Sequence, residues 1–244
     1  VGETYGARVA KVVASRLRRI GEGPRPFRHL AGALGDLLAI APFVGTTERR
    51  LVLDALAGAR LGGAHLPAVR ACLRALPPVG DAPRLAFELA TVACDQLDLD
   101  GAAAIIASVR PCPGVTALDI ADVRRRLAKR GSGTGPTLED AASWPCERPL
   151  DHLHLANLRW DAGQTERARE ELYTAIGWAE RTRDVYVAVR ARIILHILED
   201  QHDTTPDGRL LNEALGLAEE AGLVHLALHI RGLSALLCGD AERE

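Results

Sequence analysis

The chain has 244 residues, enough for one or two ordinary domains or for a row of about six or seven helix pairs. Apolar residues make up 48% of it and charged residues 25%, which excludes a disordered segment. Aromatic residues are only 4%, which argues against a β-sandwich of aromatic and β-branched strands. The net charge of −2 gives the whole molecule no long-range attraction to nucleic acid or anionic lipid.

The cysteines and the apolar segments indicate the compartment. Five cysteines are scattered with no pair closer than eighteen residues, which is typical of reduced thiols in a cytoplasmic protein. The most apolar window, 30–45, contains Asp36 and Pro42 and is too short to span a bilayer. We expect no signal peptide. Because the chain starts at Val1 and holds no methionine, we expect a fragment whose parent supplies further domains as partners.

Apolar residues in the first half recur at three- and four-residue steps, which predicts amphipathic helices. Gly62 and Gly63 predict a turn, and Thr116 with Asp119 three residues later predicts a capping box. The helices expected here are 4–20, 27–40, 46–60, one between the turn and Pro77, 81–95, one that ends at 109, and 116–130.

The second half shows the same periodicity more cleanly, and neither half contains a convincing strand. The glycine-rich segment 131–136 predicts a flexible loop, and Pro145 and Pro149 mark the expected boundary between the halves. The helices expected after this loop are 137–144, 150–162, 166–181, 185–199, 210–221 and 224–238.

One spacing of small residues occurs more than once. It is seen in Gly63, Ala68, Cys72 and Ala75, again in Gly163, Ala168, Leu172 and Ala175, and without the glycine in Ala102, Ile106 and Val109. A small residue at about every helix-pair length is typical of stacked-helix solenoids, because small side chains let two helices approach closely.

The best copy, Leu155-Ala156 followed by Gly163, Ala168, Leu172 and Ala175, resembles a tetratricopeptide repeat. In the copy that contains Ala102 and Ile106, Leu97 occupies the position of the glycine. Gly232 begins a last, incomplete copy. The longer spacing of the later copies is similar to divergent repeats of bacterial signal-transduction ATPases and transcriptional activators. The resemblance implies an all-α, right-handed solenoid of antiparallel helix pairs with about 12 helices; another α-solenoid or a helical bundle remains an alternative.

The repeat positions divide the chain into four parts. We expect an N-terminal helical cap at 1–45, degenerate repeats at 46–130, an irregular connection with a short helix at 131–148, and tetratricopeptide-like repeats at 149–244.

Motifs that would carry chemistry are weak. The glycines follow Lys129-Arg130 instead of preceding a Lys-Ser/Thr pair, so they do not form a phosphate-binding loop. The basic run 124–130 fits a solvated helix end, which with the overall charge argues against nucleic acid. His225 and His229 have metal-ligand spacing but no third ligand, and no nucleophile has a local catalytic signature. We therefore predict no metal, no cofactor and no enzymatic activity.

The resemblance implies a concave groove, lined by the first helix of each pair, that binds a protein or peptide. The positions carried over to this groove are Arg84, Thr91 and Asp95 in one copy, Asn157, Trp160 and Asp161 in the best copy, and Arg192. The predicted function is a binding module, in a regulatory or sensor region of a larger bacterial signalling or transcription-regulating protein. The alternative is a helical enzyme or ligand-binding protein with its site in 110–148.

Overall fold

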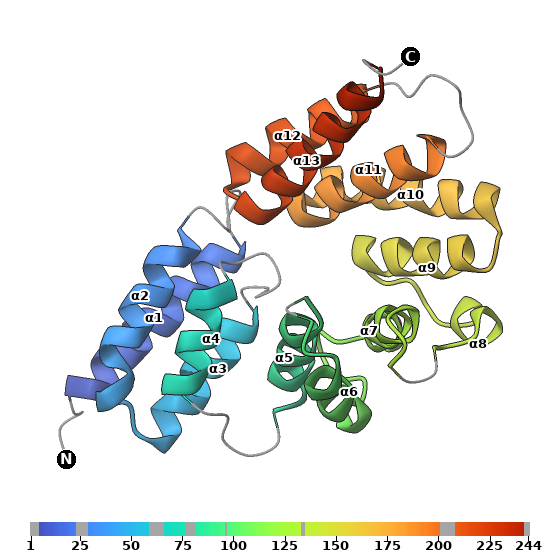
Figure 1. The fold of residues 1–244 in the computed structure, drawn as a ribbon. Helices are drawn as coiled ribbons and strands as arrows, with labels where there is room; N and C mark the ends of the chain where they lie inside the picture. Colours follow the sequence, from blue (N-terminus) through green and yellow to red (C-terminus); the bar gives the residue numbers. More distant parts are fainter. Residues whose placement is uncertain are drawn as a thin grey trace. The chain divides into compact units, whose positions relative to one another are not determined.

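The computed structural model describes residues 5–22, 29–58, 66–76, 82–95, 97–132, 135–200 and 208–241. Within these ranges the chain is all α-helical, with no strand, as the sequence predicts; an isolated bridge joins Cys112 and Val115. Twelve helices have ten residues or more, and one, α8, has five. They are α1 (Tyr5–Glu22), α2 (Leu30–Ile40), α3 (Thr46–Gly58), α4 (Leu66–Ala75), α5 (Pro83–Asp95), α6 (Leu99–Ser108), α7 (Ala117–Lys129), α8 (Leu138–Ala142), α9 (Pro149–Asp161), α10 (Thr165–Thr182), α11 (Val185–Asp200), α12 (Arg209–Ala221) and α13 (Val224–Ala241), with a 3₁₀ turn η1 (Ala41–Phe43) after α2 (Figure 1).

The chain divides into two compact units, Val1–Gly135 and Pro136–Glu244. The division falls inside the irregular segment 131–148 that the sequence predicts, about ten residues before Pro145. Each unit is described by itself below.

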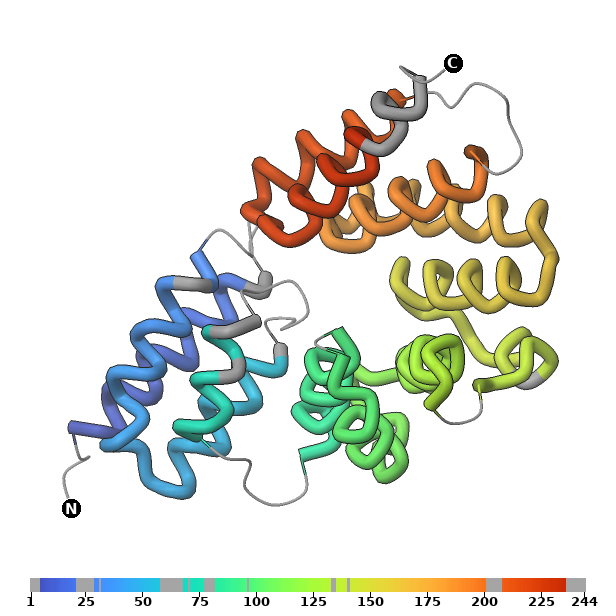
Figure 2. The backbone as a smooth tube through the Cα atoms, viewed as in Figure 1, coloured from blue at the N-terminus to red at the C-terminus, as the bar shows by residue number. Residues whose placement is uncertain are grey.

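In the first unit, α1 packs against α2 and α3, and α2 packs against α4. The buried side of α1 carries Ala10, Ala14 and Leu17 at helical spacing, so its apolar residues face its neighbours. The predicted cap at 1–45 corresponds to α1, α2 and η1, whose order along the chain can be followed in Figure 2.

The helices α5, α6 and α7 surround a second core in the same unit, which includes Ala90, Ala102 and Ile106. Local signals fix their starts. Asp98 caps α6 by accepting a bond from the Gly101 N–H at 3.2 Å. Thr116 and Asp119 form the predicted capping box at α7, since the Thr116 N–H donates to the Asp119 carboxylate at 2.8 Å.

In the second unit each helix from α9 to α13 packs on the next one along the chain, and α8 packs on α9. The core includes Leu153 and Ala156 of α9 and, from α11, Ala188 and Leu195. Gly163 has φ +75°, the left-handed conformation that glycine adopts without strain, so it permits the tight turn between α9 and α10.

The repeated small residues do not all take part in helix contacts. Ala168, Leu172 and Ala175 are fully buried, as are Ala102 and, nearly so, Ile106 and Val109. In the first copy Cys72 is buried but Ala75 is exposed, while Gly62 and Gly63 lie outside the described residues. A Cβ added to Gly232 would meet open space, so this glycine is not needed for close packing. The spacing thus marks helix interfaces in two of its copies.

Candidate partner-binding face on α9

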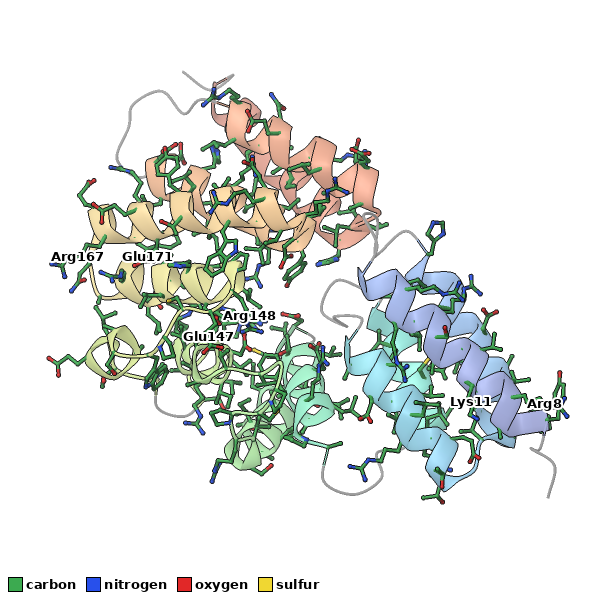
Figure 3. The ribbon with its side chains drawn as sticks, turned by 180° about the vertical axis from the view of Figure 1, so that it is seen from behind. Arg8, Lys11, Glu147, Arg148, Arg167 and Glu171 are labelled. Atoms are coloured by element: carbon green, nitrogen blue, oxygen red, sulfur yellow. The ribbon has the colours of Figure 1, made fainter. Side chains whose placement is uncertain are left out.

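The start of α9 is fixed by one buried carboxylate. Asp151 is fully buried and accepts bonds from the backbone N–H groups of Glu147 at 3.0 Å and Arg148 at 2.9 Å. The Arg148 guanidinium donates to the other carboxylate oxygen at 2.7 Å. Figure 3 shows Glu147 and Arg148 at this end of the helix. Negative charge at a helix N-terminus is stabilising, so Asp151 holds α9 rather than offering itself to a ligand.

The opposite end of α9 carries three of the predicted groove residues. Asn157, Trp160 and Asp161 are three and four residues apart, so they lie on one face of the helix. Asn157 is 4% exposed, Trp160 is half-buried against the core cluster, and Asp161 is exposed. Exposure therefore increases along this face, from the buried amide of Asn157 to the half-buried ring of Trp160 and the exposed carboxylate of Asp161.

The amide of Asn157 is not satisfied by the part of the chain that the structure describes. Its nitrogen Nδ2 is buried and has no hydrogen-bond partner there. A buried donor without an acceptor costs about 1–3 kcal/mol, so such groups are rare in stable folds. An acceptor from a bound peptide would remove that cost once the side chains that cover this nitrogen move aside.

Arg192 is placed differently from the other predicted residues. It is 7% exposed on α11 and donates from Nε to Glu213 of α12 at 3.2 Å and from another nitrogen to the Ala188 carbonyl at 3.2 Å. Its third nitrogen pairs with Glu180 of α10. All three guanidinium nitrogens are thus engaged with this chain, and Arg192 links α10, α11 and α12.

The remaining predicted groove residues belong to the first unit. Arg84 is exposed on α5, where its guanidinium lies close to Gly114. Thr91 donates to the Phe87 carbonyl of its own helix at 3.0 Å. Asp95 pairs with Arg126 of α7, so its charge is used between two helices.

A charged cluster between α9 and α10 is not among the sites that the sequence predicts. The Glu171 carboxylate lies 2.6 Å from Nδ1 of His152 and 3.1 Å from the Arg159 guanidinium. The His152 ring lies 5.7 Å from the Trp178 ring, centre to centre. Figure 3 labels Glu171 and its exposed neighbour Arg167 on α10. His152 and Arg159 are seven residues apart on one helix face, a spacing that could have suggested a shared partner.

The Cys146 thiol stands near this cluster but is poorly suited to act as a nucleophile. Burial raises its pKa to about 11, and the negative charges of Glu171 and Asp151 add to the rise, while Arg159 opposes it. A thiol with this pKa is protonated at neutral pH, and the thiolate is the reactive form. Burial also raises the pKa of Cys72 to about 11.

The central segment 110–148, the alternative location of an active site, holds carboxylates with structural partners. Asp119 belongs to the capping box of α7, and Asp122 accepts from Arg125 at 2.9 Å. In the described ranges no group of three or more His, Cys, Asp or Glu side chains is arranged to hold a metal ion.

Among the helices that the structure describes, none combines the length and apolar character that crossing a bilayer requires. The chain matches no protein-family model, no curated protein and no solved structure.

Proposed function

We propose that this protein is a non-enzymatic, tetratricopeptide-like helical-repeat module that binds a protein or peptide along the face of α9 that contains Asn157, Trp160 and Asp161. In this proposal it serves as a regulatory region of a larger signalling or transcription-regulating protein. The order of packing, in which each helix of the second unit contacts the next, supports the solenoid.

The observation that carries the proposal is the buried Asn157 amide nitrogen, which has no acceptor among the described residues and lies one turn from a half-buried tryptophan. An extended peptide presents a carbonyl or carboxylate acceptor at each residue, and a tryptophan edge offers apolar area beside it. Asp161, exposed at the end of the same face, favours a partner with a positive charge at that position.

The protected thiol at Cys146 supports a binding role over a cysteine-dependent enzyme. Glu171, which pairs with His152, raises the pKa of the Cys146 thiol and so disfavours its thiolate. Nucleophilic cysteines need the opposite environment.

A random-peptide display selection against the 244-residue protein tests this proposal and requires no candidate partner. Enriched peptides are then titrated against Asn157→Ala and Asp161→Ala, with Asn212→Ala and Glu170→Ala as controls, because these exposed residues lie on α12 and α10. We expect at least a tenfold loss of affinity in the first pair and less than a twofold change in the controls. Peptides that bind all four variants equally would contradict the assignment of this face.

A further inference from the structure

The net charge of −2 is the sum of a positive N-terminal part of the chain and a negative remainder. Residues 1–76 hold 12 of the 30 Lys and Arg residues but 5 of the 32 Asp and Glu residues, a net charge of +7. The other 168 residues hold 18 basic and 27 acidic residues, a net charge of −9. Opposite charge in two parts of a chain is a signal of binding to a polyanion through the positive part.

The positive charge is concentrated on α1. This helix carries Arg8, Lys11, Arg16, Arg18 and Arg19, which we call the basic face of α1, and its single acidic residue is Glu22. All five basic residues are exposed. Arg16 pairs with Asp36 of α2.

The buried side of α1 forces these residues outward. Ala10, Val13, Ala14, Leu17 and Ile20 form its buried line against the helices packed on it. At 3.6 residues per turn, Lys11 and Arg18 then lie along one edge of the outer side and Arg16 along the other. Arg8 and Lys11 mark this helix in Figure 3.

Between the two edges runs a central stripe of mixed character. It consists of Tyr5, Arg8, Val12, Ser15 and Arg19, spaced by three and four residues, and all of them are exposed. Tyr5 is 78% exposed and Val12 64%, high values for apolar side chains on a helix that has a buried face available.

We propose that α1 binds duplex DNA, with the basic face of α1 set against the phosphates on both sides of the major groove. A helix with its side chains is about 10–12 Å wide, and the major groove is about 12 Å wide. Arg8 and Arg19 are eleven residues apart, so their charges are spread over about 16 Å of the groove. The small Val12 and Ser15 leave room for the helix to approach the base edges, where a valine methyl fits the methyl group of thymine.

The composition of the face favours DNA over the two other anionic partners. An interfacial membrane helix needs a continuous apolar face to insert, but the apolar face of α1 is buried against α2 and α3. An acidic protein partner would need a continuous apolar centre surrounded by charge, whereas in this stripe Arg8 and Ser15 flank the single central apolar residue, Val12.

Fluorescence anisotropy with a labelled 24-base-pair duplex and the full 244-residue protein tests the proposal. We expect the logarithm of the affinity to fall with the logarithm of salt concentration with a slope of about −4, as expected for four to five phosphate contacts. Arg8→Gln with Arg19→Gln should weaken binding at least tenfold at 100 mM salt and reduce the slope by about two. Arg167→Gln with Arg181→Gln makes the same charge change at exposed positions of α10 and should alter neither value.

Circular dichroism checks that each variant is folded. If Arg8→Gln with Arg19→Gln unfolds the protein, Lys11→Gln with Arg18→Gln replaces it as the test pair. The proposal is overturned if the wild-type protein shows no binding tighter than about 100 µM at 50 mM salt, or if the α1 and α10 pairs weaken binding equally. Binding to vesicles of phosphatidylcholine and phosphatidylserine in a 3:1 ratio, or to a poly-glutamate peptide, without binding to the duplex would also overturn it.

Discussion

His152 of α9 and Glu171 of α10 are joined by a 2.6 Å contact between the ring nitrogen Nδ1 and a carboxylate oxygen. The other oxygen of Glu171 forms an ion pair with Arg159 at 3.1 Å, so one carboxylate connects two turns of the neighbouring helix. This double contact sets the register between α9 and α10, and hence the orientation of the face that carries Asn157.

Glu171→Gln should lower the free energy of unfolding of the second unit by about 1–2 kcal/mol, since it removes the charge from the contacts with both His152 and Arg159. The three tryptophans of the chain all lie between residues 136 and 244, so urea unfolding followed by tryptophan fluorescence reports on this unit. Glu166→Gln, which changes an exposed pair with Arg169, is the matched control, with an expected loss below about 0.5 kcal/mol. Equal losses in the two variants would mean that the double contact does not fix the helix pair.

The Cys146 thiol should react slowly with iodoacetamide. With a pKa of about 11 instead of the ordinary 9.0, the thiolate fraction at pH 8 falls about a hundredfold. The rate should rise with pH up to about 11, and Glu171→Gln should lower the pKa because it removes one of the charges that raise it. Peptide mapping of the alkylated protein by mass spectrometry gives the rate at this cysteine. A rate that levels off near pH 9 contradicts the raised pKa.

Arg192→Ala should cost about 2–3 kcal/mol of stability, because it leaves Glu180 and Glu213 without the cation that links them across three helices. Arg231→Ala breaks the pair between α13 and Glu219, in which both side chains are exposed, and should cost less than about 1 kcal/mol. The same urea titration measures both. A loss of peptide binding in Arg192→Ala with unchanged stability would instead assign this residue to the groove.

Ala175→Leu should destabilise the second unit by about 1–3 kcal/mol, since Ala175 is fully buried between helices and an added side chain must displace its neighbours. Ala75 holds the same place in the first copy of the repeated spacing but is exposed. Ala75→Leu should therefore change stability by less than about 0.5 kcal/mol, measured by thermal unfolding with circular dichroism. A large loss in Ala75→Leu would show that the first copy is packed like the others.

The parts of the fold that the sequence predicts are those set by residues close together in the chain. The Thr116–Asp119 capping box and the turn at Gly163 depend on residues close in sequence, and both are present. The contact of His152 with Glu171 joins residues nineteen apart and depends on the register of two helices, which no local pattern specifies. Leu97 shows a further limit, because it adopts φ +63° where the repeat pattern would have glycine.

The candidate site was predictable in outline only. Helical spacing places Asn157 and Trp160 on one face, but the buried, unsatisfied amide depends on tertiary packing. The resemblance predicts a groove position for Arg192, yet partners twelve and twenty-one residues away engage its guanidinium. The whole-chain charge argued against nucleic acid, because the acidic residues after position 76 offset the excess of basic residues before it.

The central claim is that the α9 face binds a peptide, and Asn157→Ala tests it most directly. Calorimetric titration of a selected peptide and urea unfolding are measured on the same preparation. We expect affinity to fall at least tenfold while the free energy of unfolding stays within about 1 kcal/mol of the wild-type value, because the lost amide nitrogen has no partner within the described chain. Unchanged affinity together with a loss of more than about 2 kcal/mol of stability would show that Asn157 serves the fold and would contradict the account.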